Sequence, residues 1–344
     1  MDAHAALSEI AFWLERDLAP AFKVRAFRTA AGAIAGLDPA HLEARVASGT
    51  IERVKGVGSR SAEVIAEALQ NRVPQYLVTL RANRREPMPD GLTSARALAR
   101  TARIRGDLHT HTEWSDGTTS LESMVEAAAA LGREWIAITD HSEGLSIANG
   151  LSPDRRSEQI SQIADVDEAR NDIAVLRGIE VDILEDGSLD GSETLLDALD
   201  IVVASVHSKL RAPADAITAR MLGAIEDPHV NVLAHCTGRL VAGARAPRPQ
   251  SAFDAPAVFE ACAEAGVAVE INSRPERQDP PDDLVELALD IGCLFSVDSD
   301  AHAPGHLDFV RDGMARAADL GVPAERIVTT WPLDEVRTWA ARRR

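Results

Sequence analysis

Trp135-Ile136-Ala137-Ile138-Thr139-Asp140-His141 is a short apolar run that ends in side chains able to bind a metal ion. The same pattern recurs along the C-terminal two thirds of the chain, with amphipathic helical stretches between the runs, which indicates βα units and a parallel sheet. About 240 residues fit a barrel better than an open sheet, although periodicity alone leaves the open sheet as an alternative. Seven runs are the predicted strands: Ile104–Leu108, Trp135–Ile138, Ala174–Val181, Ile201–Val206, Val230–Ala234, Val267–Ile271 and Leu294–Val297.

Metal-binding side chains stand at the carboxyl ends of most of these predicted strands. In a parallel barrel those ends share one face, so residues far apart in sequence converge on one pocket. His109 and His111 flank a single residue, and in an extended segment they point to the same side. Nine residues are the candidate metal ligands and catalytic residues: His109, His111, Asp116, His141, Glu180, His207, His235, Asp300 and His302.

The chemistry of these donors predicts the cofactor. Imidazole and carboxylate groups without thiolate suit zinc, manganese or iron better than magnesium. Nine candidates exceed the needs of one ion, so we expect two or three divalent ions. Asp140 and Asp298 adjoin candidate ligands and are expected to accept hydrogen bonds from ligand imidazoles.

The other histidines have simpler interpretations. A single histidine is more often a hydrogen-bonded core or surface residue than a ligand, and His4, His41 and His229 are interpreted in that way. His306 is an intermediate case, because it is close to the candidate site in sequence but outside its pattern.

The motif order resembles the polymerase and histidinol phosphatase (PHP) family over residues 104–344. The resemblance is carried by six segments: His109-Thr110-His111-Thr112, Thr139-Asp140-His141, Gly178-Ile179-Glu180, Ser205-Val206-His207, Ala234-His235 and Asp298-Ser299-Asp300-Ala301-His302. It implies a distorted seven-stranded (β/α)7 TIM-like barrel, a site for two or three metals at the nine ligand positions, and a metal-dependent phosphoesterase.

Within that family, the chain is most similar to the PHP domain of bacterial family X DNA polymerases. Ala234-His235-Cys236-Thr237-Gly238-Arg239-Leu240 resembles an HPTGR segment with Cys in place of Pro, and Val269-Glu270-Ile271-Asn272 resembles the strand that follows it. Arg239, Asn272 and Arg277 lie on or beyond strand ends and are candidate substrate-binding residues that clamp phosphate. Surface salt bridges with nearby carboxylates are an equally good interpretation of them.

Residues 1–85 are predicted to form a small all-helical domain, joined by a linker over 86–103 to the barrel domain at 104–344. The segments Phe22–Arg28 and Val54–Arg60 resemble the DNA-binding domain that opens family X polymerases, the second as a helix-hairpin-helix. Glycines at such a turn let the backbone approach a phosphate at a helix start. An ordinary helix connection is the alternative. The candidate DNA-binding residues are Lys23, Arg25, Lys55, Gly56, Gly58, Ser59 and Arg60.

The leading hypothesis is a phosphoesterase that processes DNA ends, as a 3′-5′ exonuclease or in 3′-end processing for DNA repair. Polymerase activity is not expected, because residues 1–105 contain no paired Asp to hold magnesium. The alternative is a small-molecule phosphomonoesterase such as a histidinol phosphatase. A DNA-binding module with a purely structural metal is disfavoured, since nine ligands exceed what structure requires.

Charge and cysteine content set the remaining expectations. The 344 residues carry a net charge of −18, which disfavours a protein that coats nucleic acid. Residues 1–105 carry +5 and residues 106–344 carry −23, so DNA contact is expected through the first part and at strand ends. Three widely spaced cysteines and the lack of a long apolar stretch predict a cytoplasmic protein without a membrane partner. The sequence leaves the oligomeric state open.

Overall fold

The structure is a computed structural model that describes residues 1–83, 103–243 and 246–342. It divides the chain into two units, Met1–Met88 and Pro89–Arg344, each considered by itself below. The expected linker over 86–103 lies outside the described residues, apart from its last residue.

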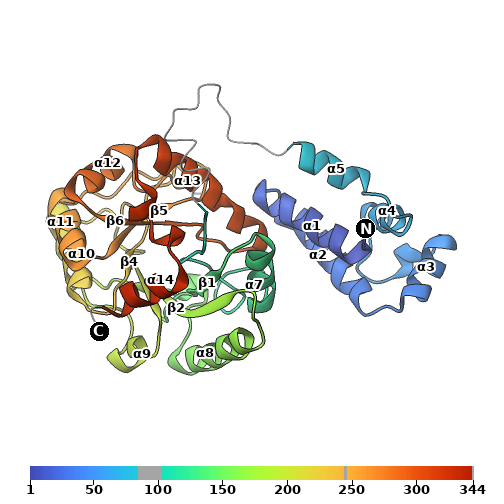
Figure 1. Ribbon diagram of the computed structural model, residues 1–344, viewed down its shortest axis with the longest axis horizontal. Helices are drawn as coiled ribbons and strands as arrows, with labels where there is room; N and C mark the ends of the chain where they lie inside the picture. The colour runs from blue at the N-terminus through green and yellow to red at the C-terminus, as the bar shows by residue number, and fades with distance from the viewer. Residues whose placement is uncertain (84–102, 244–245, 343–344) are drawn as a thin grey trace. The chain divides into compact units, whose positions relative to one another are not determined.

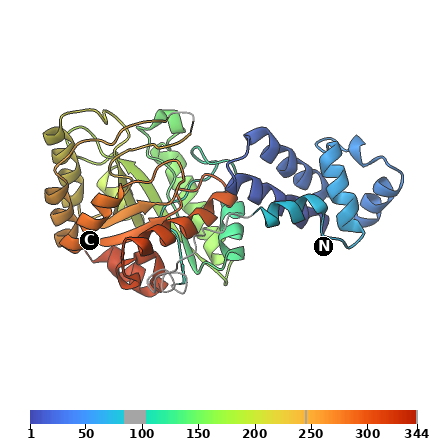
Figure 2. The same cartoon turned by 90° about the horizontal axis from the view of Figure 1, so that it is seen from above.

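The first unit is all helical, with α1 and α2 packed side by side (Figures 1 and 2). Apolar residues at helical spacing, among them Leu7, Ile10 and Ile34, build its core, and Asp2 and Asp38 cap the starts of α1 and α3. Its helices are α1 (Ala3–Arg16), α2 (Ala21–Ala35), α3 (Pro39–Ala47), α4 (Ser59–Leu69) and α5 (Gln75–Ala82).

A tight turn connects α3 to α4 after a short 3-10 helix at Ile51–Arg53. Val57 is buried and anchors the turn, whereas the glycines on either side of it are exposed. Gly56 has φ +98°, and a Cβ there would lie 2.8 Å from the Thr29 side chain, so both conformation and packing favour glycine. Gly58 is the N-cap of α4 and makes no side-chain hydrogen bond, so no capping side chain occupies the amides at the start of this helix.

The second unit contains a curled, all-parallel sheet in the order β1-β2-β3-β4-β5-β6. Nearly all strand residues are buried, as expected for a parallel sheet covered by helices. The pairing is staggered, because β1 pairs with residues 174–177 of β2 whereas β3 pairs with residues 178–182. The strands are β1 (Trp135–Ile138), β2 (Ala174–Asp182), β3 (Ile201–Ser205), β4 (Val232–Leu233), β5 (Ala268–Asn272) and β6 (Leu294–Asp298).

Helices surround this sheet on its outer side (Figure 1). They pack through a large apolar cluster that includes Val181, Phe259 and Phe295. The last helix instead closes the barrel interior, where Val336 and Trp339 join a cluster formed by the first residues of several strands. The helices are α7 (Leu121–Ala130), α8 (Pro153–Glu168), α9 (Glu193–Asp197), α10 (Ala214–Glu226), α11 (Ala255–Ala265), α12 (Asp282–Ile291), α13 (Val310–Asp319) and α14 (Leu333–Ala341).

The prediction of seven strands was wrong by one, because Ile104–Leu108 is not a strand. Residues 105–110 still pair with the β1 region, since the amides of Trp135, Ala137 and Thr139 donate to their carbonyls. On the other side, however, the Asp298 side chain accepts from Leu108 N–H, and the Asp107 side chain accepts from Ser299 N–H. Carboxylates therefore take the place of backbone partners at Asp107 and Leu108, and the six strands form a curled half-barrel.

Two further features of the described residues concern the cysteines and the helices. All three cysteines are buried and free. None of the described helices has the length and apolar character needed to cross a membrane.

Candidate metal centre

Glu180, on β2, lies at the centre of the predicted ligands and is 1% exposed. Its Oε1 is 2.9 Å from His235 Nε2 and 3.1 Å from His207 Nε2. Its Oε2 is 3.1 Å from His109 Nε2, 2.9 Å from His141 Nδ1 and 3.4 Å from His111 Nε2. One buried carboxylate thus faces five imidazoles that come from four different segments of the chain.

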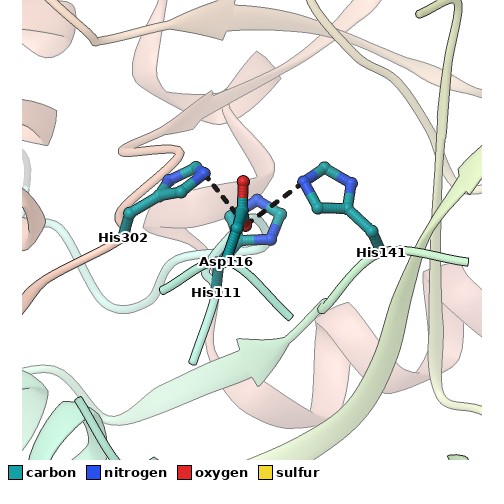
Figure 3. Close-up of side chains that lie close together, drawn as sticks. All are labelled: His111, Asp116, His141 and His302. Carbon is teal, nitrogen blue, oxygen red and sulfur yellow. Dashed lines mark ion pairs between the residues drawn. The ribbon is translucent and has the colours of Figure 1, made fainter. Parts of the chain in front are cut away.

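Asp116 extends this array toward the surface. Its Oδ1 is 3.3 Å from His302 Nε2 and 3.5 Å from His141 Nε2, and His111 lies beside this pair (Figure 3). Asp300 joins the array as well, with its Oδ1 3.6 Å from His111 Nε2. All nine predicted ligands therefore lie together at the carboxyl ends of the strands.

The arrangement fits several cations. Four overlapping groups place their donor atoms within 4.8 Å of one another: His111, Asp116, His141 and His302; His109, His111 and Asp300; His109, Glu180 and His235; and His141, Glu180 and His207. Because residues such as Glu180 and His141 belong to two groups, the ions that these groups hold would share ligands.

Unsatisfied ring nitrogens support this interpretation. His109 Nδ1 donates to Glu270 Oε1 at 2.6 Å, and its Nε2, which has no hydrogen-bond partner, faces Glu180 and can offer a lone pair once it is deprotonated. His302 Nε2 lies 3.3 Å from Asp116 Oδ1, and its Nδ1 lies 2.9 Å from the Asp300 carbonyl oxygen and 3.0 Å from Arg274 Nη1. Buried nitrogens of His111, His207 and His235 also have no hydrogen-bond partner. Buried lone pairs oriented in this way are what a metal ion requires.

The charges at the centre favour protonation of two histidines while no cation is bound. Burial opposes the charge on His207, but Glu180 and Asp182 outweigh it and raise the pKa of His207 to about 9. Burial is likewise outweighed at His109, where Glu180 and Glu270 raise the pKa well above its usual value. Burial, His302 and His141 lower the pKa of His111 to about 4. Protons therefore compete with metal at His109 and His207.

Two ligands adopt an uncommon backbone conformation. His235 has φ +26° and Asp300 has φ +50°, in the left-handed region that side chains other than glycine rarely adopt. Such conformations cost about 1–3 kcal/mol each and persist only where the surroundings impose them. At these positions they direct the two side chains into the centre.

Glu270 is a functional residue that the sequence analysis missed. It is fully buried on β5, orients His109, and accepts from the His235 N–H at 2.7 Å and from Asn272 Nδ2 at 3.1 Å. The sequence signal is a carboxylate inside the otherwise apolar strand Ala268–Asn272, whereas the predicted ligands follow the strands.

Two expected hydrogen-bond roles were wrong. Asp140 accepts no imidazole; its partners are Thr112, Ser115 and Gln159. Asp298 accepts from the Leu108 amide, because the closing segment lacks a backbone partner there. Among the remaining histidines, His229 bonds to Asp227 and Asp197, and His306 accepts from the His302 N–H at 3.3 Å.

A cavity of about 380 Å³ opens beside the centre and is lined by Asp116, His141, Glu180 and His302. Arg248, Arg274 and Arg277 line it as well, and Leu145, Ile147 and Leu240 add apolar surface. Of the three residues expected to bind substrate, only Arg277 lines the cavity. Asn272 is 2% exposed and bonds to Glu270 and Asp300, and Arg239 lies outside the lining with its guanidinium bonded to Gln278.

All seven residues predicted to bind DNA are exposed in the first unit. Arg60 pairs with Glu63 at 2.7 Å and lies over the Tyr76 ring. Arg28, which belongs to the basic segment Phe22–Arg28, instead forms two hydrogen bonds with the buried Glu15. Its charge is therefore used inside the unit.

The raised pKa values predict that metal uptake releases protons. Binding requires neutral imidazoles, so metal affinity should rise from pH 6.5 to 9 by up to about tenfold per pH unit for each proton displaced. Without metal, the His207 contribution to stability is present below about pH 6.5 and is lost as pH rises through about 9. Titration calorimetry in buffers of different ionisation enthalpy would measure the released protons; an affinity independent of pH would contradict the assignment.

Comparison with known proteins shows which families and proteins this chain is similar to. The family model described as the PHP domain matches residues 107–274. The DNA polymerase/3′-5′ exonuclease PolX of Bacillus subtilis is 34% identical over 245 residues, which are 71% of this chain and 42% of that protein. A probable phosphatase of Aeromonas hydrophila is 29% identical over 236 residues, which are 66% of this chain and 89% of that protein.

The chain thus spans less than half the length of its PolX relative. Among solved structures, the histidinol phosphate phosphatase of Lactococcus lactis superposes with a TM-score of 0.47 at 17% identity, over 64% of this chain and 95% of that one. The family match spans seven of the nine predicted ligands, all except Asp300 and His302, so this chain contains a PHP domain.

Proposed function

We propose that this protein hydrolyses phosphoester bonds at DNA ends, as a 3′-5′ exonuclease or a 3′-end-processing enzyme, without polymerase activity. The observation that carries the proposal is the array of nine ligands around Glu180 beside a cavity lined by three arginines. Two or three divalent ions, of zinc, manganese or iron, suit these donors. When bound, they supply Lewis-acid stabilisation of phosphate charge and lower the pKa of a water toward ~7 so that it can attack phosphorus.

The arginines contribute the part of the chemistry that the protein itself provides. Arg277 Nε donates to Asp300 Oδ2 at 3.0 Å, and Arg274 donates to the Asp300 carbonyl at 3.2 Å, so both guanidinium groups are held against the ligand array. Arg274 also contacts His302 Nδ1 at 3.0 Å and Glu276 Oε1 at 3.5 Å. Both arginines line the cavity, and guanidinium geometry suits bidentate contacts with phosphate oxygens there. They would orient the phosphate and offset the charge that develops on it.

The cavity favours a nucleotide as the substrate group. Its volume of about 380 Å³ is in the range of small-ligand sites. Ile147 is 88% exposed at its edge and, with Leu145 and Leu240, provides apolar contact for a base or sugar. The PolX relative is named as a 3′-5′ exonuclease, which supports this choice.

A histidinol-phosphatase activity is the alternative, and one side chain favours it. Glu276 also lines the cavity, and its Oε2 is buried without a hydrogen-bond partner. A carboxylate in that position could accept the ammonium group of a small amino-phosphate substrate. The probable phosphatase relatives are consistent with such a reaction.

The first unit supports DNA as the partner through local features rather than overall charge. Residues 1–83 carry ten Lys and Arg against nine Asp and Glu, so the unit is almost neutral. Lys55, Gly56 and Gly58 are exposed beside the amides at the start of α4. A helix start of this kind binds phosphate through backbone N–H groups, and Lys55 adds the opposite charge.

The direct test compares hydrolysis of DNA ends with hydrolysis of histidinol phosphate. Purified protein loaded with manganese or zinc should shorten the recessed 3′ strand of a DNA duplex, and should act on histidinol phosphate at least about 100-fold less efficiently, as measured by kcat/KM. Addition of all four deoxynucleotides should produce no extension. Turnover of histidinol phosphate alone would establish the alternative and exclude the proposal.

The cavity predicts different effects for two arginines that sequence alone treats alike. Arg277→Gln should lower kcat/KM on DNA ends by about 10- to 150-fold, the loss of a charge-assisted hydrogen bond worth about 1.5–3 kcal/mol. Arg239→Gln is the matched control and should change kcat/KM less than about threefold, because Arg239 lies outside the cavity lining. Equal losses in both variants would show that phosphate binds elsewhere.

The role of the first unit can be measured separately from hydrolysis. Lys55→Ala should weaken DNA binding at all sequences and reduce the slope of log affinity against log salt by about 0.9. Hydrolysis of a mononucleotide should not change. Arg72→Ala, which removes an exposed charge outside the turn, serves as the control. An unchanged slope in Lys55→Ala would remove the turn from the DNA interface.

A further inference from the structure

A fully buried polar network connects α8 to the loop that carries Asp116. Arg156 and Gln159, on adjacent turns of α8, are both 0% exposed. Gln159 Nε2 donates to Asp140 Oδ2 at 2.5 Å, and its Oε1 accepts from Arg156 at 2.6 Å. Arg156 also donates to the carbonyls of Asp140 at 2.7 Å and His141 at 2.9 Å. The helix therefore fixes both the side chain and the backbone of the turn that presents His141.

Asp140 in turn holds the loop at residues 112–116. Its carboxylate accepts from the Thr112 N–H at 2.8 Å, the Thr112 hydroxyl at 2.7 Å and the Ser115 N–H at 3.2 Å, and the Ser115 hydroxyl also donates to it. With Gln159, five donors converge on one buried carboxylate. Asp116 follows Ser115 directly, so this carboxylate determines where Asp116 is presented.

Asp116 depends on this support more than the other acidic ligands do. Its side chain is 34% exposed, whereas those of Glu180 and Asp300 are 1% and 2% exposed. Asn149 and Arg155 hold the loop from outside by donating to the Trp114 carbonyl. The interior support comes from Asp140.

We propose that Asp140, Arg156 and Gln159 are positioning residues for one particular cation site, the group formed by His111, Asp116, His141 and His302. They act through the loop of Asp116 and the turn of His141, and none of them belongs to a ligand group. The groups around Glu180 have a different support, because Glu270 orients His109 and the His235 backbone. Asp116 and His302 belong to this group alone, whereas His111 and His141 are shared with other groups, so a displaced Asp116 should weaken this group more than the others.

The test measures metal content, so it is independent of which substrate the enzyme cleaves. It rests on the proposed metal centre. Asp140→Asn and Gln159→Met are compared with the wild type in zinc and manganese titrations, followed by elemental analysis of the equilibrated protein. Asp116→Asn is the reference for loss of this group, and Glu180→Gln for loss of the others. Glu158→Gln, an exposed residue on the same helix, is the matched control.

The two network variants should reproduce the Asp116→Asn pattern. The weakest-bound ion should lose about 10- to 100-fold in affinity, the effect usual for residues that support a ligand, while the tighter ions stay as in the wild type. Circular dichroism should show a folded protein, and if Asp140→Asn fails to fold, Gln159→Met decides. Wild-type affinities in the variants, or equal loss of all ions as in Glu180→Gln, would overturn the inference. If the wild type binds no ion, the assignment of the metal centre itself is contradicted.

Discussion

The burial of Glu180 among five imidazoles is the constraint on which the rest of the centre depends. An unpaired carboxylate in a protein interior is strongly unfavourable, and additional neutral imidazoles do not remove that cost. In the absence of metal, burial tends to raise the pKa of Glu180, but His109, His141 and His207 hold it well below its usual value, because some of them take up protons. Cations replace those protons at the same position. The folded chain therefore supplies a pocket of negative charge and lone pairs. This pocket requires positive charge, either as protons on the imidazoles or as bound cations.

The parallel sheet explains which features of the fold and of the site can be predicted from the sequence. Six apolar runs became strands, since a run buried on both faces has little alternative in a parallel sheet. The nine ligands were predictable because parallel strands bring their carboxyl ends to one face, whatever the exact path of the loops. Ile104–Leu108 was different, since Asp107 and Asp298 offer carboxylate acceptors where a strand would offer carbonyls. A local apolar pattern does not reveal that carboxylates, rather than backbone carbonyls, accept the hydrogen bonds here.

Residues that act through tertiary contacts were harder to predict. Glu270 lies within β5, and only the structure shows that His109 and the His235 amide both meet its carboxylate. Arg239 and Arg277 look equivalent in sequence, but Arg277 lines the cavity and Arg239 bonds to Gln278. Arg248 and Arg274 were missed for the same reason. The direction of a side chain in an irregular loop depends on packing that spacing does not encode.

The charge distribution of the chain affects how DNA can approach the cavity. A barrel with a net charge of −23 should repel a polyanion, and the first unit is too nearly neutral to offset this by itself. Three of the acidic residues, Asp116, Glu180 and Asp300, lie in the ligand array, where bound cations would neutralise them. Arg248, Arg274 and Arg277 line the same opening, so a phosphate that enters it meets three positively charged side chains. Screened interactions over about 8–10 Å at physiological salt make the local groups decisive for a phosphate entering the cavity. A DNA end, which brings few phosphates close to the barrel, suits this distribution better than a long duplex lying across it.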